Sequence, residues 1–255
     1  MKVAILCGGR GLRMNELTED MPKPMANVCG RPMLWHIMKN YKHFGFDDFV
    51  LLLGYKGEKI KEYFMDYEWR NHNFKLDTVK ETLEFFEPVE DWKITFLDTG
   101  SETMTGSRIR RAKDVLGNET FMLTYGDGLS DVDINKLLEY HRSMGKIATV
   151  TGVKKKTQYG ILTIQDGLAK SFSEKEDLGA VINGGFFVIE PEIFDYIDDN
   201  GTCCALEEAP LKNLAKDGEL AVYLHEGFWT ACDTYSDIIN INQLCNNGDS
   251  LWRAW

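Results

Sequence analysis

The stretch that decides the fold is Lys2-Val3-Ala4-Ile5-Leu6-Cys7-Gly8-Gly9-Arg10-Gly11-Leu12-Arg13. Its first six residues form a short apolar run typical of a strand, and three glycines follow within four positions. Glycines after a strand let the backbone approach a ligand and point amide N–H groups at it, which favours a phosphate. Taken alone, they also fit a tight turn without a ligand. The loop has no GK[ST] of a Walker A motif, and Met14 replaces the third glycine of the GxGxxG fingerprint.

Strand and helix patterns alternate through the first half of the chain. After the opening strand the predicted elements are the helix Pro32–Phe44, the strand Phe49–Leu53, the helix Glu58–Tyr67, the strand Ile94–Leu97, a helix around Arg108–Leu116 and the strand Phe121–Tyr125. Such alternation predicts an α/β fold with a doubly wound, mainly parallel (Rossmann-like) sheet. Ligands bind beyond the carboxyl ends of these strands. The loops Gly8–Arg13 and Tyr125–Gly128 both follow strands, so we expect them on one rim.

Beyond residue 146 the pattern changes to short strands separated by turn residues, which predicts a smaller mixed or antiparallel part. The predicted elements are the strands Ala148–Val153, Gly160–Ile164, Leu168–Phe172, Gly185–Ile189 and Leu220–His225, and helices near Pro191–Ile197, Leu206–Ala215 and from about Tyr235. No linker or repeat divides the chain, so we predict one domain, 1–255, with halves 1–145 and 146–255. The segment Asn71–Trp92 is the least regular, and fits either a flexible loop or an oligomer contact.

Two cations and two carboxylates stand out. Arg13 follows the glycines, and Lys23 lies between two prolines that stiffen its backbone, although a surface lysine in a turn is the alternative. Asp127 ends an apolar strand between glycines and is a candidate Mg²⁺ ligand, or else a turn aspartate. Asp233 is the second candidate ligand, with an N-cap of the last helix as its alternative role.

A third group lies in the second half. Glu174, Lys175 and Asn183 offer an acceptor, a cation and an amide, which a polyol phosphate could use together. Solvated charge at a strand end is the default interpretation of Glu174 and Lys175.

Composition excludes several classes of protein. With 44% hydrophobic and 27% charged residues the chain is globular, and its net charge of −11 argues against a nucleic-acid partner. No apolar run approaches the ~18 residues of a membrane span, and the N-terminus lacks a signal peptide. The six cysteines show no CxxC spacing, so we expect reduced thiols in a cytoplasmic protein. The five histidines form no ligand pattern and are expected to have packing or surface roles.

Together these segments resemble the sugar nucleotidyltransferase family, and within it the glucose-1-phosphate cytidylyltransferases. The family's GGxGxR loop and PKP sequence match Gly8–Arg13 and Pro22–Pro24. The similarity covers nearly the whole chain, through Leu34–Lys39, Gly54–Gly57, Asp98–Gly100, Met104–Gly106, Thr124–Gly128, Phe172–Lys175, Asn183–Phe187 and Gly227–Thr234.

The resemblance implies Mg²⁺-dependent transfer of CMP from CTP to a phosphorylated small molecule, foremost α-D-glucose 1-phosphate, with release of pyrophosphate. It implies a catalytic set of Lys23, Arg13 and Asp127, with Asp127 and Asp233 on the metal. The residues implied to bind the nucleotide are Gly8, Gly9, Gly11, Arg13, Lys23, Thr105, Tyr125 and Gly126. Glu174, Lys175 and Asn183 would face the acceptor. Relatives commonly assemble, so a homo-oligomer is compatible with the resemblance.

Departures from the family pattern cluster on the acceptor side. Leu12 replaces the usual threonine, the EKP signature reads Glu174-Lys175-Glu176, and Lys154–Lys156 stand where the glucose enzymes tend to be apolar. A non-sugar acceptor, such as phosphocholine or phosphoglutamine, therefore stays an alternative. A non-catalytic nucleotide sensor is a second alternative, disfavoured because Lys23 and Asp233 are both present. The broken GxGxxG argues against an NAD-dependent oxidoreductase.

Overall fold

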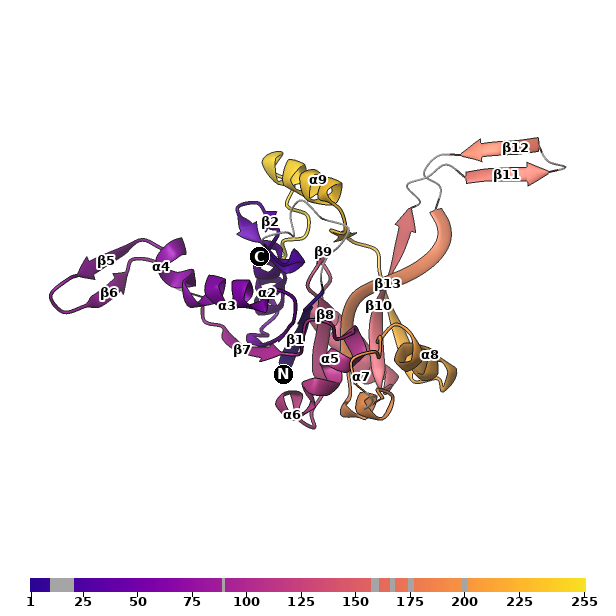
Figure 1. Cartoon of the computed structure of the whole chain (residues 1–255). Coiled ribbons are helices and arrows are strands. Elements are labelled where there is room, and N and C mark those ends of the chain that lie inside the picture. The colour runs from indigo at the N-terminus through magenta and orange to yellow at the C-terminus, as the bar shows by residue number, and fades with distance from the viewer. Residues whose placement is uncertain (10–20, 89, 157–160, 166–167, 174–176, 199–200) are drawn as a thin grey trace.

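A seven-stranded sheet in the order β14-β10-β13-β8-β1-β4-β7 forms the centre of the molecule (Figure 1). The computed structural model describes the chain outside residues 10–20, 89, 157–160, 166–167, 174–176 and 199–200. Four of the six pairings in this sheet are parallel, and only β13 runs antiparallel to both neighbours. The strands are β1 (Lys2–Cys7), β4 (Asp48–Leu53), β7 (Lys93–Asp98), β8 (Phe121–Tyr125), β10 (Ala148–Lys156), β13 (Asp177–Ile189) and β14 (Leu220–His225).

The central strands are apolar along most of their length, because helices cover both faces of the sheet. In β1, Val3 and Ile5 belong to one hydrophobic core, whereas Ala4 and Leu6 belong to the other. Alternate side chains of a strand point to opposite faces, so the strand separates two cores. The predicted doubly wound, mainly parallel α/β sheet is thereby confirmed. The sheet draws strands from both halves of the chain, while the assignment of one domain with a nucleotide half and an acceptor half stays a prediction.

Helices cover both faces of the sheet. The first core is lined by α2 (Met33–His43), α3 (Gly57–Met65), α7 (Ile134–Met144) and α9 (Tyr235–Asn246). The second is lined by α5 (Thr105–Arg111), α6 (Lys113–Leu116), α8 (Ala209–Lys216) and the 3-10 helix η3 (Pro191–Asp195). Within the described part of the chain, no helix has the length and apolar character needed to cross a membrane.

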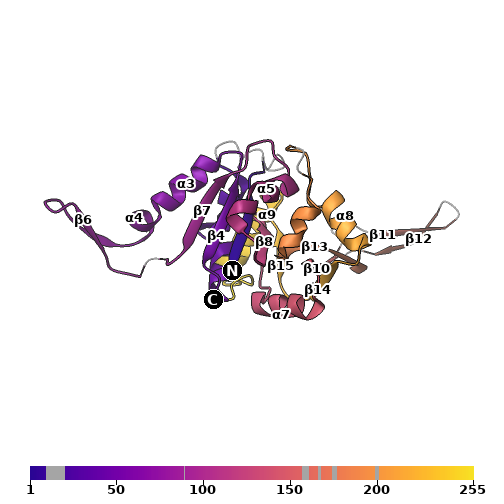
Figure 2. The same cartoon turned by 90° about the horizontal axis from the view of Figure 1, so that it is seen from below.

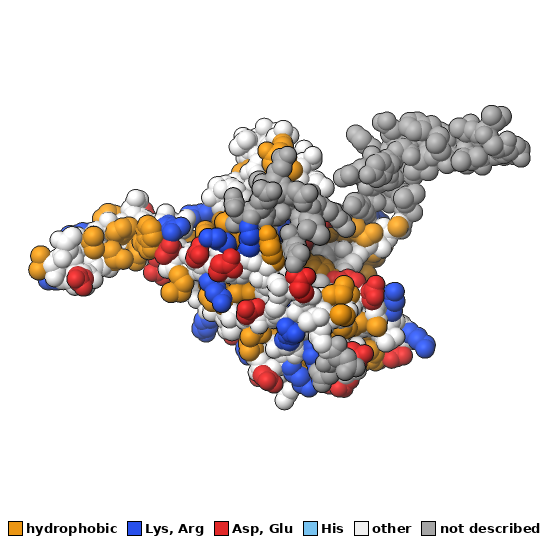
Figure 3. Space-filling view, viewed as in Figure 1, with side chains coloured by type: hydrophobic (Ala, Val, Ile, Leu, Met, Phe, Trp, Pro, Cys, Tyr) orange, Lys and Arg blue, Asp and Glu red, His pale blue; other side chains and the backbone are white. Residues whose placement is uncertain are grey.

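Two hairpin arms leave the body in opposite directions (Figures 1 and 2). One is β11 (Ile161–Gln165) with β12 (Leu168–Ser173), and the other is β5 (Phe74–Asp77) with β6 (Thr82–Phe85), which follows the short helix α4 (Tyr67–Asn71). The β5–β6 arm lies in the segment whose sequence is least regular. Hydrophobic side chains gather on it (Figure 3), among them Leu76 and Leu83, which are 54% and 46% exposed.

A disulfide corrects the expectation that all six cysteines are reduced thiols. Cys29 and Cys245 are bonded, with their Cα atoms 5.9 Å apart, whereas Cys7, Cys203, Cys204 and Cys232 are free. The partners are separated by 216 residues, so no local spacing announces the pair. The fold brings them within the Cα distance that a disulfide spans.

Several boundaries also differ from the expectation. The residues near Pro191–Ile197 form a 3-10 helix, and α8 begins at Ala209 because Glu208 before it has a non-helical backbone conformation, with φ −97° and ψ −109°. The sequence patterns did not identify α7, which Asp133 caps by accepting a hydrogen bond from the amide of Lys136.

Candidate active site

Lys23 joins two carboxylates that are far apart in the sequence. Its Nζ donates to Asp127 Oδ2 at 2.6 Å and to Asp233 Oδ1 at 2.7 Å. The two aspartates lie 104 and 210 residues after the lysine along the chain. All three are predicted site residues, and the fold brings them to one point.

Each of the three side chains is held by a different element. Lys23 begins the 3-10 helix η2 (Lys23–Met25) directly after Pro22. Asp127 follows β8, where the amide of Gly126 donates to the carbonyl of Leu6 in β1. The short strands β9 (Gly128–Ser130) and β15 (Trp229–Ala231) pair antiparallel, which brings the chain before Asp233 alongside Asp127.

The alternative role of Asp233 as an N-cap is wrong. Thr234 caps α9 instead, since its side chain accepts from the amide of Asp237 and the Asp237 carboxylate accepts from the amide of Thr234. This reciprocal capping box stabilises the helix end and leaves Asp233 to the ion pair with Lys23.

The ion pairs decide the charge of Lys23. Burial lowers the pKa of its ammonium, but Asp127 and Asp233 outweigh that effect and raise the pKa above its ordinary value. The side chain of Lys23 is 11% exposed, and those of Asp127 and Asp233 are 34% and 44% exposed. A largely buried cation thus faces two carboxylates that solvent and ligands can reach.

The three residues lie at a cavity of about 510 Å³, within the range of small-molecule sites. The predicted residues that line it are Gly8, Gly9, Lys23, Thr105, Tyr125, Gly126, Asp127 and Asp233. Asn183 does not line the cavity, but its Nδ2 donates to the hydroxyl of Tyr125 at 3.3 Å. Gly11, Arg13, Glu174 and Lys175 lie outside the described residues.

Arg108 is a site residue that the sequence reasoning missed. Its buried guanidinium donates to the carbonyls of Gly8, Leu53 and Gly100, at 2.9, 3.0 and 2.7 Å. It therefore ties together the loops that follow β1, β4 and β7. A Cβ on Gly8 would lie 2.1 Å from this guanidinium, so a larger residue there would displace Arg108 from its hydrogen bonds. No sequence pattern separates this arginine from the surface arginines beside it.

Glu207 is the second residue that was missed. Its carboxylate accepts from the hydroxyls of Tyr125 and Thr105, at 2.5 and 2.7 Å, and it lines the cavity. Burial and the neighbouring Glu207 raise the pKa of Tyr125, so the phenol stays protonated and donates to the carboxylate. The buried hydroxyl of Thr103 also lines the cavity and has no hydrogen-bond partner among the described residues.

The paired carboxylates fit a divalent cation. Magnesium is usually held by one or two carboxylates together with substrate phosphates and waters. Asp127 and Asp233 already converge on one cation, the Lys23 ammonium. No cluster of three or more potential protein ligands occurs in the described chain, so a metal here would take its other ligands from substrate and water.

Comparison with known proteins places the chain among enzymes. A model of the nucleotidyl transferase family matches residues 2–248. The chain is 54% identical over 255 residues to a probable glucose-1-phosphate cytidylyltransferase of Bacillus subtilis strain 168, and 42% identical over 258 residues to the glucose-1-phosphate cytidylyltransferase of Salmonella typhi. Both alignments cover all of this chain and all of the relative.

Solved structures agree in fold. HddC from Yersinia pseudotuberculosis superposes with a TM-score of 0.68 at 23% identity, covering 95% of this chain and 98% of that one. At that identity the similarity shows a shared fold and nothing more. The family model and the two full-length relatives match this chain in sequence. The chain therefore belongs to the nucleotidyl transferase family, and within it to the sugar nucleotidyltransferases that include the glucose-1-phosphate cytidylyltransferases.

Proposed function

We propose that this protein transfers CMP from CTP to α-D-glucose 1-phosphate, giving CDP-glucose, a precursor of surface polysaccharides, and pyrophosphate. The observation that carries the proposal is the convergence of Lys23, Asp127 and Asp233 at one cavity. The choice of CTP and glucose 1-phosphate is supported by the two relatives that match over their full length.

The reaction is an in-line displacement at phosphorus. An oxygen of the acceptor's phosphate attacks the α-phosphorus of CTP, the bond to the β-phosphate oxygen breaks, and pyrophosphate leaves. The acceptor's phosphate is largely ionised at pH 7, because its second pKa is about 6, so no general base is needed. Alignment and neutralisation of negative charge are the protein's tasks. Lys23, whose pKa is raised, stays charged and neutralises the reacting phosphate.

Asp127 and Asp233 would hold Mg²⁺. When bound, the ion supplies positive charge to the triphosphate and the leaving pyrophosphate. Neither carboxylate serves as a nucleophile in this proposal, since the attacking oxygen belongs to the acceptor.

The nucleotide would lie along the loop after β1. Gly8 and Gly9 line the cavity and could offer it backbone amides, and the buried hydroxyl of Thr103, which has no partner among the described residues, is a further polar contact for the nucleotide. Thr105, Tyr125 and Gly126 line the same cavity. Gly11 and Arg13 are proposed to contact the phosphates.

The acceptor would lie on the side of Asn183 and Tyr125, together with Glu174 and Lys175. The hydrogen-bonded set of Asn183, Tyr125 and Glu207 offers amide, hydroxyl and carboxylate groups to a sugar's hydroxyls. A choline acceptor fits less well, because quaternary ammonium groups are bound by cages of aromatic rings. Tyr125 is the one aromatic side chain among the described residues that line the cavity.

We place the protein in the cytoplasm, where nucleoside triphosphates are made, with no membrane or nucleic-acid partner. We also propose that it forms a homo-oligomer through the β5–β6 arm, whose apolar side chains are exposed (Figure 3).

Pyrophosphate release tests the proposal. Each nucleoside triphosphate is combined with glucose 1-phosphate, mannose 1-phosphate, phosphocholine and phosphoglutamine in the presence of Mg²⁺. CTP with glucose 1-phosphate is expected to give the highest kcat/KM. A higher value for another acceptor would overturn the glucose assignment, and absence of turnover with every pair would favour the nucleotide sensor.

A further inference from the structure

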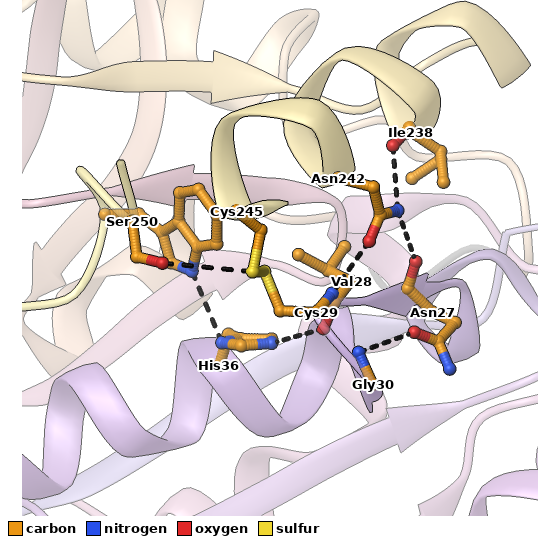
Figure 4. Close-up of a disulfide and its surroundings, with 10 residues drawn as sticks. Asn27, Val28, Cys29, Gly30, His36, Ile238, Asn242, Cys245 and Ser250 are labelled. Atoms are coloured by element: carbon orange, nitrogen blue, oxygen red, sulfur yellow. Dashed lines mark hydrogen bonds between the residues drawn. A yellow bond between two sulfur atoms is a disulfide. The ribbon is translucent and has the colours of Figure 1, made fainter. Parts of the chain in front are cut away.

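The disulfide between Cys29 and Cys245 (Figure 4) joins two segments. Each of them also carries an active-site residue. Cys29 occupies the turn between β2 (Asn27–Val28) and β3 (Arg31–Pro32), six residues after Lys23. Cys245 lies in the last turn of α9, twelve residues after Asp233. The bond therefore joins the Lys23 segment to the Asp233 helix at the end remote from the reacting groups.

Hydrogen bonds reinforce this connection. Asn242 lies one turn before Cys245 on the same face of α9. Its Oδ1 accepts from the amide of Cys29 at 2.8 Å, and its Nδ2 donates to the carbonyl of Asn27 at 3.0 Å (Figure 4). The disulfide and Asn242 together form a clasp, defined here as Cys29, Cys245 and Asn242, between the β2–β3 turn and α9.

Short, ordered segments connect the clasp to the ion pairs of Lys23 and Asp233. Prolines flank Lys23, and the amides of Met25 and Ala26 donate to the carbonyls of Pro22 and Lys23. On the other side, α9 is a 12-residue helix, about 18 Å long, that a capping box closes beside Asp233. Because both connections are short and ordered, fixing one end limits how far Lys23 and Asp233 can move apart.

We infer that the clasp positions Asp233 relative to Lys23 for the binding of Mg²⁺ and nucleotide, and that opening the disulfide weakens this binding. The inference rests on the proposed function, because it assumes that Mg²⁺ and nucleotide bind beside Lys23 and Asp233. In the reductive opening, a dithiol supplies two electrons and two protons. The S–S bond breaks, Cys29 and Cys245 each gain a hydrogen on sulfur, and the dithiol becomes a cyclic disulfide.

A count of free thiols shows whether the disulfide is present, because the other four cysteines are free. Cys7 and Cys232 are buried, and burial raises the pKa of both thiols, that of Cys232 to about 12. Cys203 is exposed and lies outside the cavity lining, so it serves as the control position. Wild-type protein unfolded without reductant is expected to show four thiols, and six after reduction. Six thiols without reductant would overturn the inference at once.

Calorimetric titration of Mg²⁺–CTP, without acceptor, measures the positioning effect. The proteins compared are the wild type, the wild type reduced with dithiothreitol, Cys29→Ser/Cys245→Ser, Asn242→Ala and Cys203→Ser. Loss of a residue that orients a metal ligand typically weakens metal binding about 10-fold or more. We expect the Mg²⁺ concentration for half-saturation to rise about 10-fold in the reduced wild type, in Cys29→Ser/Cys245→Ser and in Asn242→Ala. It should not change in Cys203→Ser.

Two comparisons separate positioning from general damage. Dithiothreitol should weaken binding by the wild type but leave the Cys29→Ser/Cys245→Ser protein unchanged. Reduced wild-type protein needs no refolding, so it keeps the test valid if the double variant folds poorly. Equal Mg²⁺–CTP affinity for oxidised and reduced wild type would overturn the inference alone. No Mg²⁺–CTP binding by the oxidised wild type would overturn the proposed function, and the inference with it.

Discussion

Among the described residues, two lysines each join two aspartates, and only one of these lysines lies at the cavity. Lys23 contacts Asp127 and Asp233, whereas Lys42 Nζ lies 3.1 Å from Asp47 and 2.8 Å from Asp91 on the surface. Variants of Lys42 therefore show the effect of breaking an ion pair on the surface, and variants of Lys23 show the effect of breaking one at the reacting phosphate.

Replacement of Lys23 by alanine is expected to lower kcat by at least about 10²-fold, as for loss of one oxyanion-stabilising donor. The physical reason is loss of a charge that neutralises the transferring phosphate. Steady-state pyrophosphate release measures the effect, with Lys42→Ala as the matched control. Near-normal turnover of the Lys23→Ala protein would remove the lysine from the mechanism.

Asp127→Asn and Asp233→Asn keep the shape of each side chain but remove its charge. Each is expected to raise the Mg²⁺ concentration for half-maximal turnover by about 10-fold or more, since carboxylates are the protein ligands that Mg²⁺ prefers. Asp47→Asn, in the surface pair, is the control. A variant whose Mg²⁺ dependence matches the wild type does not bind the metal through that residue.

His36 couples pH to stability. Its Nδ1 accepts from the indole of Trp252 at 3.3 Å, so Nε2 carries the hydrogen donated to the carbonyl of Val28 at 2.7 Å. Burial lowers the pKa of His36 to about 4. An unfolded histidine titrates near 6.5, so the unfolded state gains a proton first as the pH falls and the folded state loses stability between pH 6.5 and 4.

The expected loss from this residue is about 2 kcal/mol between pH 7 and pH 5. Urea unfolding at both pH values measures it, and His36→Gln should reduce the difference by that amount. His43, which lies in the same helix but is not buried, provides the control variant His43→Gln. If His36→Gln leaves the pH dependence as in the wild type, the buried imidazole is not its source.

At the scale of elements, Gly8 contacts Arg108, whereas its described neighbour Gly9 does not. A Cβ at Gly8 would lie 2.1 Å from the guanidinium, whereas a Cβ at Gly9 would meet nothing within 4 Å. Gly8→Ala is expected to lower the free energy of unfolding by about 1–3 kcal/mol through overpacking. Gly9→Ala should fold with near wild-type stability. Thermal unfolding measures both, and a Gly8→Ala protein as stable as Gly9→Ala would contradict the packing role of Arg108.

The sequence predicts elements well where one local rule determines them. The buried strands β1, β4 and β8 are continuous apolar runs, and their limits differ from the predicted ones by at most one residue. The arm β5–β6 was not predicted, although its strands alternate apolar and polar residues, because each run is only four residues long and is a weak signal by itself. Lys23, Asp127 and Asp233 were found because proline or glycine surrounds them or a family motif includes them.

Arg108, Glu207 and the disulfide depend on long-range contacts, and no local rule predicts those. Arg108 differs from Arg110 and Arg111 only in the direction that α5 gives its side chain. Glu207 is one of two adjacent glutamates, and only the partner hydroxyls of Tyr125 and Thr105 distinguish it. The Cys29–Cys245 pair requires the first and last parts of the chain to be packed together.

At the scale of the whole molecule, the β5–β6 arm is amphipathic yet stands away from the body (Figure 2). Leu76 and Leu83 are direct cross-strand partners, as are Phe74 and Phe85 two pairs further along, so all four side chains share one face. Lys75 and Glu84 pair on the opposite face. A two-stranded hairpin is marginally stable in water on its own, so its apolar face calls for another surface.

A second copy of the chain is the surface we propose, and substitutions on the two faces test it. Leu76→Asp/Leu83→Asp places charges on the apolar face and is expected to convert the oligomer to monomer at micromolar concentration, because buried unpaired carboxylates are strongly unfavourable. Lys75→Ala/Glu84→Ala, on the polar face, should keep the wild-type mass. Light scattering coupled to gel filtration reads the mass directly. A wild type that elutes as a monomer of 29.2 kDa at tens of micromolar would show that the arm serves another partner.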